Sequence, residues 1–296
     1  MQAALLPDRG VVKVAGDAAR AWLGNLVTTD MGRVKPGAPR FAALLTPQGK
    51  IVADFIVAEA EPTDGGGFFL DCPRALAGEL TQRLNRYKLR AKVMVEDVSE
   101  VLGVMAVWGG TPNARFALAY PDPRLPALGM RCMLAPHRAE DAAKAMGARL
   151  VDASAYEAHR IALGVPRGGL DFAYGDAYPH ETDMDQLGGV DFDKGCYVGQ
   201  EVVSRVEHRA VARSRVVPIA YDGFAPDAGS PITAGDKQVG TLGSTAQGRG
   251  LALLRLDRIT DAMAQGVPLA SGGTAIRLVK PEWARFAWPG EVKTAQ

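Results

Sequence analysis

The 296-residue sequence predicts an α+β protein that ends in a small β-barrel. Before residue 213, groupings of strand, helix and two further strands recur, and this order favours mixed, mostly antiparallel sheets with helices. Beyond it, short apolar runs separated by turn residues take over, which is typical of a small barrel. We therefore expect a first region over 1–212, built of two interleaved α+β subdomains, a barrel over 213–280 and an irregular tail over 281–296.

The composition is that of an ordinary soluble globular protein. Hydrophobic residues make up 47% and charged residues 23% of the chain, and 34 basic residues against 33 acidic ones leave a net charge of +1. This balance produces no overall field that would attract nucleic acid or a membrane surface. No apolar run approaches the roughly 20 residues that a membrane span needs. We expect no direct binding of nucleic acid or membrane.

The three cysteines, Cys72, Cys132 and Cys196, lie far apart and form no CxxC pair. This spacing argues against a disulfide framework and against a zinc site, so we expect no resident metal. The first residues have neither the charged nor the apolar region of a secretory signal. We therefore expect a cytoplasmic protein.

Local signals predict the elements of the first region in order. Apolar runs between turn residues indicate strands, and apolar residues at every third or fourth position indicate helices, with Asp17 as a cap and Pro73 as a helix opener. The expected strands are 11–15, 42–45, 51–58, 67–71, 92–98, 101–108, 115–119 and 130–134. The expected helices are 18–27, the residues after Pro73, 137–146 and 152–163.

The expected strand over 51–58 contains one acidic residue, Asp54. Both faces of this strand are otherwise apolar, so the carboxylate is expected to be buried. A buried carboxylate needs a partner or shifts its pKa, and such groups are enriched at functional sites. From the residues alone, an Asp satisfied by backbone donors or by an arginine is slightly favoured over a catalytic one.

Residues 166–195 carry several glycines and show no sustained periodicity. Connections of this length inside a compact domain are usually functional or disordered. Apolar side chains such as Phe172 and Met184 would anchor this one, so we interpret it as a ligand-lining loop. Taken alone, His180 is expected to be a surface residue rather than a ligand or a base.

The loop leads into a segment rich in reactive groups, DFDKGCYVGQEVVSRVEHR. Lys194, Cys196, Gln200, Glu201 and Arg205 lie within it. Glycines bracket the cysteine and apolar residues then recur at helical spacing, so we expect a tight loop followed by a helix. The helix N-terminus and Lys194 would favour the thiolate of Cys196, whereas the other two cysteines are expected to be structural.

In the barrel, short apolar runs between turn residues predict the strands. They cover 215–221, 231–233, 237–245, 250–256 and 274–279, with a short helix near 257–265. The tail is expected to be irregular and docked through Trp283, Phe286 and Trp288.

The octapeptide KGCYVGQE, residues 194–201, resembles the signature of the YgfZ family. These are folate-binding proteins linked to iron–sulfur cluster maturation and tRNA modification, and they are related to the glycine-cleavage T-protein (aminomethyltransferase). Residues 9–30, 45–57, 86–95 and 156–166 are also similar to family segments, in the expected order. The resemblance covers most of the chain, although the barrel matches in style alone. It implies a T-protein-like fold around a central folate site.

The resemblance also implies roles for individual residues. Asp54 falls where the T-protein keeps an acid beside the reactive end of the folate, but Ala53 stands where T-proteins often have a second acid, which argues against methylene transfer. Glu181 matches the acid that hydrogen-bonds the pterin ring, whose adjacent N–H donors suit a carboxylate. Cys196 with Lys194 matches the cysteine motif that true T-proteins lack.

We therefore expect tetrahydrofolate, or a folate derivative, as the cofactor. Its candidate contacts are Asp54, Glu181, Gln200, Glu201 and Arg205, and the candidate reacting groups are Cys196, Lys194 and Asp54.

The leading hypothesis is a folate-binding accessory factor with a working thiol at Cys196, whose partners are iron–sulfur proteins or cluster carriers and tRNA-modifying enzymes. Whether this thiol ligates iron or attacks a partner stays open, and a single cysteine cannot hold a cluster alone. One alternative is a folate-dependent aminomethyltransferase or demethylase that uses Asp54. Another is a folate-regulated binding module without catalysis.

Overall fold

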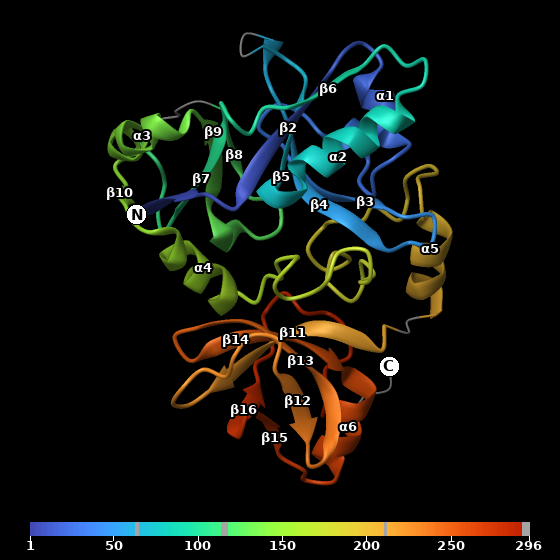
Figure 1. Ribbon diagram of the computed structural model, residues 1–296, viewed down its shortest axis with the longest axis vertical. Coiled ribbons are helices and arrows are strands. Elements are labelled where there is room, and N and C mark those ends of the chain that lie inside the picture. The colour runs from blue at the N-terminus through green and yellow to red at the C-terminus, as the bar shows by residue number, and fades with distance from the viewer. Residues whose placement is uncertain (63–64, 114–117, 210–211, 292–296) are drawn as a thin grey trace. The chain divides into compact units, whose positions relative to one another are not determined.

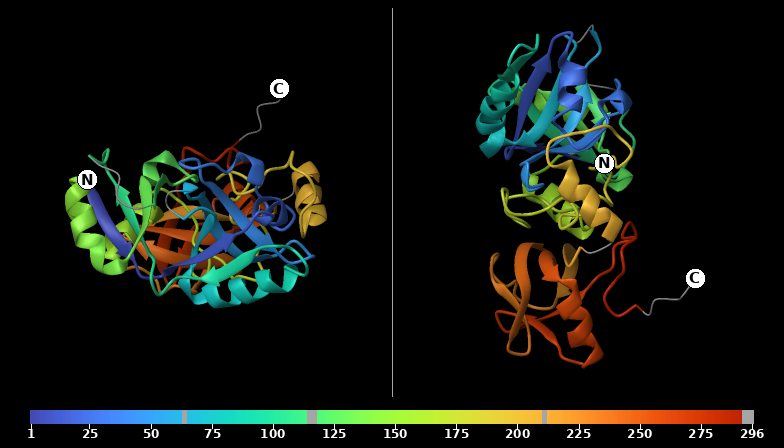
Figure 2. Two further views of the ribbon diagram at one scale, coloured as in Figure 1. Left: turned by 90° about the horizontal axis from the view of Figure 1, so that it is seen from above. Right: turned by 90° about the vertical axis from the view of Figure 1, so that its right-hand side faces the viewer.

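The computed structural model describes residues 1–62, 65–113, 118–209 and 212–291. Their contacts divide the chain into two compact units (Figures 1 and 2). The first consists of Met1–Tyr156 and Leu187–Gln200, and the second of Glu157–Gln186 and Glu201–Gln296. The barrel thus shares its unit with part of the long loop, and the domain bounds expected from the sequence stay a prediction.

One sheet of the first unit is entirely antiparallel, in the order β3-β4-β5-β2-β6. Its strands are Arg40–Leu45, Ile51–Glu59, Phe68–Pro73, Arg9–Ala15 and Met94–Asp97. Helix α2 (Arg74–Tyr87) packs on β2 and β5 (Figure 1), and its Leu80 and Leu84 are buried because they recur on one helical face. The short helices α1 (Ala19–Gly24) and η1 (Met31–Arg33) lie between β2 and β3 in the chain.

The other sheet of this unit has the order β10-β1-β7-β9-β8. Its strands are Arg149–Leu150, Gln2–Leu6, Gly103–Trp108, Met130–Leu134 and Leu118–Pro121. Only the pairing of β1 with β10 is parallel among the described strands. Helix α3 (Ala139–Met146) covers this sheet through small side chains and Met146, preceded by the short helices η3 (Pro126–Leu128) and η4 (Pro136–Arg138).

Within residues 212–291 the chain closes a six-stranded barrel in the order β11-β14-β13-β12-β15-β16. The strands are Ser214–Tyr221, Arg249–Arg255, Lys237–Ala246, Pro231–Ala234, Leu269–Ser271 and Thr274–Leu278. Helix α6 (Leu256–Ala264) lies beside the strands (Figure 2), and the tail aromatics Trp283, Phe286 and Trp288 pack on the barrel core. The α+β class and the C-terminal barrel are confirmed.

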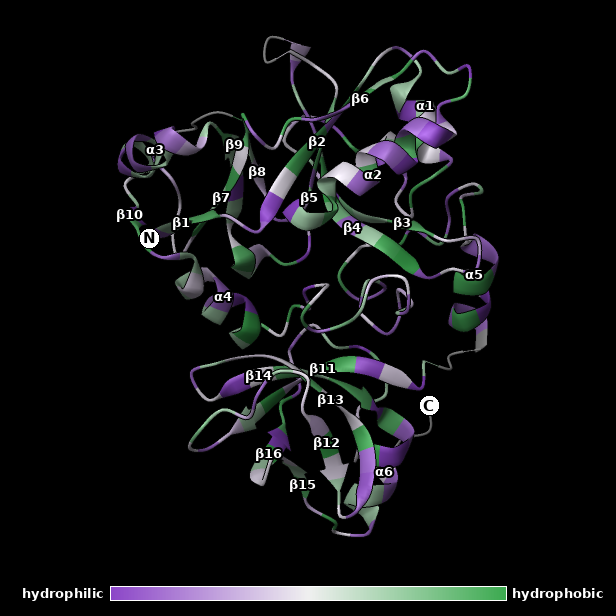
Figure 3. Cartoon of the chain, viewed as in Figure 1, coloured by the Kyte–Doolittle hydropathy of each residue, from purple (hydrophilic) through white to green (hydrophobic). Residues whose placement is uncertain are grey.

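Two more helices, α4 (Ala153–Ala162) and α5 (Gln200–Arg209), contain residues of both units. Hydrophobic and hydrophilic residues both occur along α5 (Figure 3), and its Val203 is buried while Glu201 and His208 are exposed. No helix in the described ranges is long and apolar enough to cross a membrane.

Some expectations for individual elements are wrong. The N-cap of α1 is Ala18, without a side-chain cap, so Asp17 does not play this part and the helix ends earlier than expected. Strands β1, β10 and β15 were missed, because apolar runs of two to five residues show no diagnostic period. The expected strand over 115–119 falls mainly outside the described residues, and β8 begins at Leu118.

A buried ion network joins the two sheets of the first unit. Asp71 on β5 accepts hydrogen bonds from Arg9 Nε on β2 at 2.6 Å and from Arg131 Nη1 on β9 at 2.6 Å. Arg131 Nε also donates to Asp122 Oδ2 at 2.9 Å. Burial by itself would raise the pKa of Asp71, but Arg131 and Arg9 outweigh it and the pKa is lowered. The charges are therefore mutually compensated inside the core.

Replacement of Arg131 by Met should destabilise the protein by about 3–5 kcal/mol, because Asp71 and Asp122 would each lose a hydrogen bond between charged groups, although Arg9 and Arg124 stay paired with them. Arg138→Met is the matched control, since Arg138 is half exposed and lies 3.6 Å from an exposed Asp141. We expect it to cost less than about 1 kcal/mol. Urea unfolding followed by circular dichroism measures both, and equal losses would contradict the assigned role of the network.

Candidate functional site

Residues 187–199 form an irregular segment of the first unit, here called the cysteine loop. Its main anchor is the buried carboxylate of Asp191. Oδ2 accepts hydrogen bonds from the Thr29 hydroxyl at 3.0 Å and from the Asp30 N–H at 2.7 Å. Oδ1 accepts from Arg33 and Arg40, each at 2.9 Å. Burial opposes ionisation of Asp191, yet these donors lower its pKa, so the anchor is a carboxylate.

Backbone groups add to this anchor. The Asp191 N–H donates to the Thr28 carbonyl at 3.0 Å, and the Thr28 hydroxyl donates to the Gly189 carbonyl at 2.6 Å. The cysteine loop is thus joined to the segment between α1 and β3 by paired main-chain and side-chain contacts. Irregular backbone needs such partners because it has no ladder of its own.

Lys194 holds the loop on its other flank. Its ammonium donates to the carbonyls of Gly24 at 2.7 Å and Val27 at 2.6 Å, at the end of α1, and lies 4.6 Å from the Tyr197 ring centroid. Burial lowers the pKa of Lys194 to about 8, although Asp30 and Asp191 act in the opposite direction. The Lys194 side chain therefore joins the cysteine loop to backbone carbonyls near the end of α1. Its expected effect on the ionisation of the Cys196 thiol stays a prediction.

The loop ends where Gly199 meets the turn between β3 and β4. Its φ is +83°, and a Cβ at this position would lie 2.5 Å from the Thr46 carbonyl oxygen. A larger residue would therefore be strained and would also displace the turn. Together with Asp191 and Lys194, Gly199 fixes the backbone on both sides of Cys196.

Cys196 is exposed and lines an open cavity of about 740 Å³ in the first unit. Charged residues of α1 and its neighbourhood share this cavity, among them Asp17, Arg20, Asp30, Asp193 and Lys194. The thiol is therefore accessible from solvent across a polar surface. Lys194 and Cys196, both predicted from the sequence, are brought together here.

The other two cysteines are buried, as expected for structural residues. Cys72 Sγ lies 3.7 Å from the Gly10 carbonyl oxygen, and Cys132 is on β9. Burial raises the pKa of each thiol to about 12. Their thiolates are therefore scarce at neutral pH.

The predicted folate contacts are distributed over both units. Asp54 is on β4, opposite Ala43 of β3, and is 7% exposed, so its expected burial is confirmed while its role stays a prediction. Gln200 opens α5. Glu201 and Arg205 form an exposed ion pair on that helix, with 2.7 Å between Oε1 and Nη2, so these two side chains are engaged with each other at the surface.

Glu181 lies in the part of the long loop that belongs to the second unit. Its Oε2 accepts a hydrogen bond from the Tyr178 N–H at 2.9 Å, and its carbonyl accepts one from the Val216 N–H of β11 at 2.7 Å. The expectation that the neighbouring His180 lies at the surface is wrong, because this residue is 3% exposed. Its ring Nε2 lies 2.9 Å from Glu207 Oε2.

Arg215 of β11, which the sequence reasoning missed, explains this burial. It donates to the carbonyl of His180 at 2.7 Å, to Asp183 Oδ1 at 2.9 Å and to both carboxylate oxygens of Asp185 at 2.9 and 2.8 Å. The guanidinium thereby draws the loop onto the barrel strand. The sequence contains one signal for this role. An arginine begins the apolar run RVVPIAY, and a charged side chain on a largely buried strand needs partners of opposite charge.

Comparison with known proteins defines the family. Residues 8–122 match the model of the GCVT N-terminal domain, and residues 213–286 match that of the CAF17 C-terminal beta-barrel domain. The human iron-sulfur cluster assembly factor IBA57, a mitochondrial protein, is 32% identical over 315 residues, which cover 96% of this chain and 84% of that protein. The chain belongs to the IBA57 family.

Other IBA57 relatives agree. The mouse protein is 31% identical, over 97% of this chain and 86% of its own length. The homologue from Mycosarcoma maydis is 36% identical over 74% of this chain, and the match spans only 57% of that longer protein. Among solved structures, the glycine cleavage system aminomethyltransferase T from Bartonella henselae has a TM-score of 0.74 with 14% identity, covering 97% and 87% of the two chains.

These findings confirm the T-protein-like fold and correct one expectation. The IBA57 relatives, a YgfZ-related family, are named as mitochondrial proteins, so the cytoplasmic localisation expected from the sequence is wrong. The physical reason is that unpaired cysteines indicate a reducing compartment without distinguishing the cytoplasm from the mitochondrial matrix.

The three thiols should differ sharply in reactivity. We expect an alkylating reagent at neutral pH to modify Cys196 in the folded protein and to modify Cys72 and Cys132 only after unfolding, because burial both shields these two and raises their pKa. Mass spectrometry of timed digests measures the three rates. Comparable rates in the folded protein would contradict the structure.

Lys194 should make stability depend on pH. Its folded pKa is about 8 against 10.5 unperturbed, so between these values the unfolded chain binds more protons at this amine, and stability rises with pH. We expect the unfolding free energy of the wild type, relative to Lys194→Met, to increase from about pH 8 to about pH 10. Urea unfolding at several pH values measures this difference, and a constant or falling value would refute it.

Proposed function

We propose that this IBA57-family protein is a tetrahydrofolate-binding accessory factor for iron–sulfur cluster assembly, with Cys196 as its working thiol. The observation that carries the proposal is the placement of Cys196, exposed in an open cavity on a loop that Asp191, Lys194 and Gly199 hold rigid. A thiol needed only for packing would be buried, as Cys72 and Cys132 are. Its family supports iron–sulfur cluster assembly as the process.

Any iron or cluster at Cys196 needs further ligands from a partner. In the described residues, the group of three or more metal-ligating side chains close enough to share an ion does not include Cys196. Protein-held iron–sulfur clusters require several thiolate or imidazole ligands. The partners we propose are therefore iron–sulfur proteins or cluster carriers, including tRNA-modifying enzymes, which would complete the ligand set across the open cavity.

The folate part of the proposal is supported by the T-protein-like fold and by two carboxylates. Asp54 is buried in β4, and Glu181 is oriented by the Tyr178 N–H and by its own backbone contact with β11. A carboxylate fixed in this way suits the paired N–H donors of a pterin. Gln200, Glu201 and Arg205 are proposed as further contacts. Bound tetrahydrofolate would supply amine nitrogens that carry one-carbon units.

One-carbon transfer is the second candidate function. The burial of Asp54 favours it, because a buried carboxylate can act on a folate amine. Ala53, where a second acid would stand, weighs against it. A folate-regulated binding module without thiol chemistry is the third candidate.

A complementation experiment separates these functions. In cells that lack the endogenous factor, Cys196→Ala should abolish the support of an iron–sulfur enzyme while tetrahydrofolate binding persists. His208→Ala, an exposed position on α5, is the control and should behave as the wild type. If Cys196→Ala supported the iron–sulfur enzyme fully, the thiol proposal would be refuted. Methylene transfer that survives Cys196→Ala but not Asp54→Ala would favour the transferase instead.

Calorimetry with tetrahydrofolate tests the cofactor independently. Glu181→Gln should weaken binding by about 10- to 100-fold, since a hydrogen bond to a charged group contributes about 1.5–3 kcal/mol. Asp54→Asn should weaken it as well. The absence of binding to the wild type would rule out the folate part while leaving the thiol proposal intact.

A further inference from the structure

A second cavity, of about 390 Å³, lies in the unit that contains the barrel. His180, Asp185 and Glu207 line it, together with Arg215, Arg285 and Phe286. Neither the thiol chemistry nor the folate contacts use these side chains. Each of the first three offers one ligand atom, and the three atoms lie within 4.8 Å of one another.

We propose that His180, Asp185 and Glu207 bind one divalent transition-metal ion of the Zn²⁺ or Fe²⁺ type. His180 Nε2 and Glu207 Oε2 are 2.9 Å apart. Ligands bonded at about 2.0–2.1 Å to a tetrahedral ion lie about 3.3 Å from each other, so small side-chain shifts would create the site. One imidazole with two carboxylates suits these ions better than Ca²⁺ or Mg²⁺, which prefer oxygen alone. A fourth position would stay open toward the cavity.

The ligands are held by contacts of the kind that orient metal ligands. Arg215 fixes both oxygens of Asp185, at 2.9 and 2.8 Å, and also binds the carbonyl of His180 at 2.7 Å. The guanidinium is itself placed 4.4 Å from the Phe286 ring centroid. His180 and Asp185 are thus preorganised on a strained loop, since the intervening Asp183 has a φ of +59°. Such outer contacts set ligand direction and affinity.

The local charge also favours a cation. Asp183 is fully buried beside Arg215, and its Oδ2 has no hydrogen-bond partner in the described part of the chain. Arg215 is shared between the carboxyl groups of Asp183 and Asp185, while Glu207 lies against the His180 ring. A dication bound between His180, Asp185 and Glu207 would add positive charge beside these carboxyl groups.

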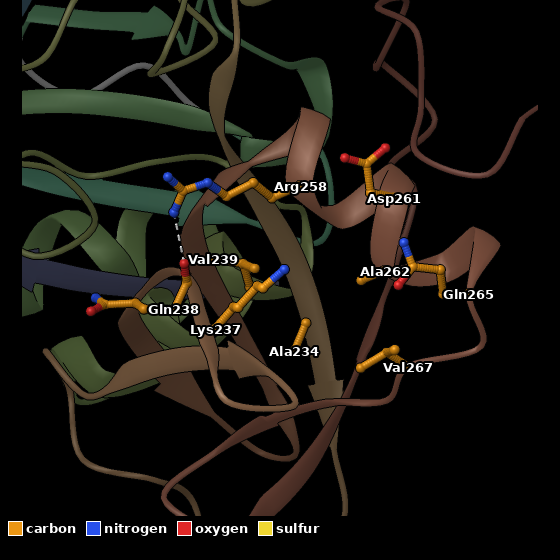
Figure 4. A pocket seen from close by; sticks show the side chains of 9 residues that line it. All are labelled: Ala234, Lys237, Gln238, Val239, Arg258, Asp261, Ala262, Gln265 and Val267. Carbon is orange, nitrogen blue, oxygen red and sulfur yellow. Dashed lines mark hydrogen bonds between the residues drawn. The ribbon is translucent and has the colours of Figure 1, made fainter.

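Another cavity of this unit, of about 590 Å³, provides a contrast (Figure 4). Lys237, Arg258 and Asp261 line it, and Arg258 donates to the Gln238 carbonyl at 2.9 Å. With a single carboxylate among two cations, this cavity has no ligand set for a metal. Asp261 therefore serves as a control for nonspecific binding to surface carboxylates.

The test is a Zn²⁺ titration in competition with a chromophoric chelator, on full-length, chelator-stripped protein that carries Cys196→Ser so that the exposed thiol does not contribute. We expect one ion per chain. Glu207→Gln and Asp185→Asn should each weaken binding at least about tenfold, whereas Asp261→Asn should leave it unchanged. Glu207 is partly exposed, so its variant should fold even if Asp185→Asn does not. Bound Co²⁺ should show visible d–d bands without a thiolate charge-transfer band.

Two results would overturn the proposal. One is the absence of stoichiometric Zn²⁺ binding to the Cys196→Ser protein. The other is equal affinity in Glu207→Gln, which would make the contact between His180 and Glu207 an ordinary hydrogen bond. Neither result bears on the thiol or the folate, because the metal site rests on different residues.

Discussion

The position of Cys196 depends on the carboxylate of Asp191. This side chain collects hydrogen bonds from a hydroxyl, a backbone N–H and two guanidinium groups, all from the segment around α1 and β3. The cysteine loop has no regular hydrogen-bond ladder, so without these contacts its backbone would sample many conformations. An ionised, fully engaged carboxylate thus replaces secondary structure as the element that defines the site.

In each unit a cationic side chain holds part of the long irregular connection in place, and the two side chains differ in type. In the first, Lys194 places a compact ammonium on two carbonyl oxygens at the end of α1. In the second, Arg215 spreads its planar donors over two carboxylates and a carbonyl. The choice follows from shape, because an ammonium fits converging single acceptors whereas a guanidinium forms paired contacts with carboxylates. In the first unit Lys194 acts together with the anchor at Asp191, and in the second unit Arg215 orders the connection.

Local sequence patterns predicted much of the fold, because the spacing of apolar residues and the residue types at turns are local properties of the chain. The helix over Leu80 and Leu84, the hairpin of β3 and β4 and the burial of Asp54 all followed from the residues near them. The anchor at Asp191 and the burial of His180 did not follow. Both depend on arginines far away in the sequence, and nothing in the chain near either residue specifies that partner.

The candidate site was predictable to the same extent. Cys196 was singled out through its flanking glycines and the octapeptide, which are local features of the sequence, and its role stays a prediction. The expectation of no resident metal rested on the cysteine spacing, which does not bear on a candidate site built from a histidine and two acids. Those three ligands come from a loop and from α5, so their convergence is a property of the folded unit alone.

The fit of Gly199 against the Thr46 carbonyl limits the movement of the chain beside Cys196. With the chain fastened at Asp191 on one side and at Gly199 on the other, the backbone that carries the cysteine is constrained from both directions. If Cys196 is the working thiol proposed above, a partner must bring its reacting atom to the polar cavity that this residue lines. The shape of the partner's surface would then select among the molecules that approach.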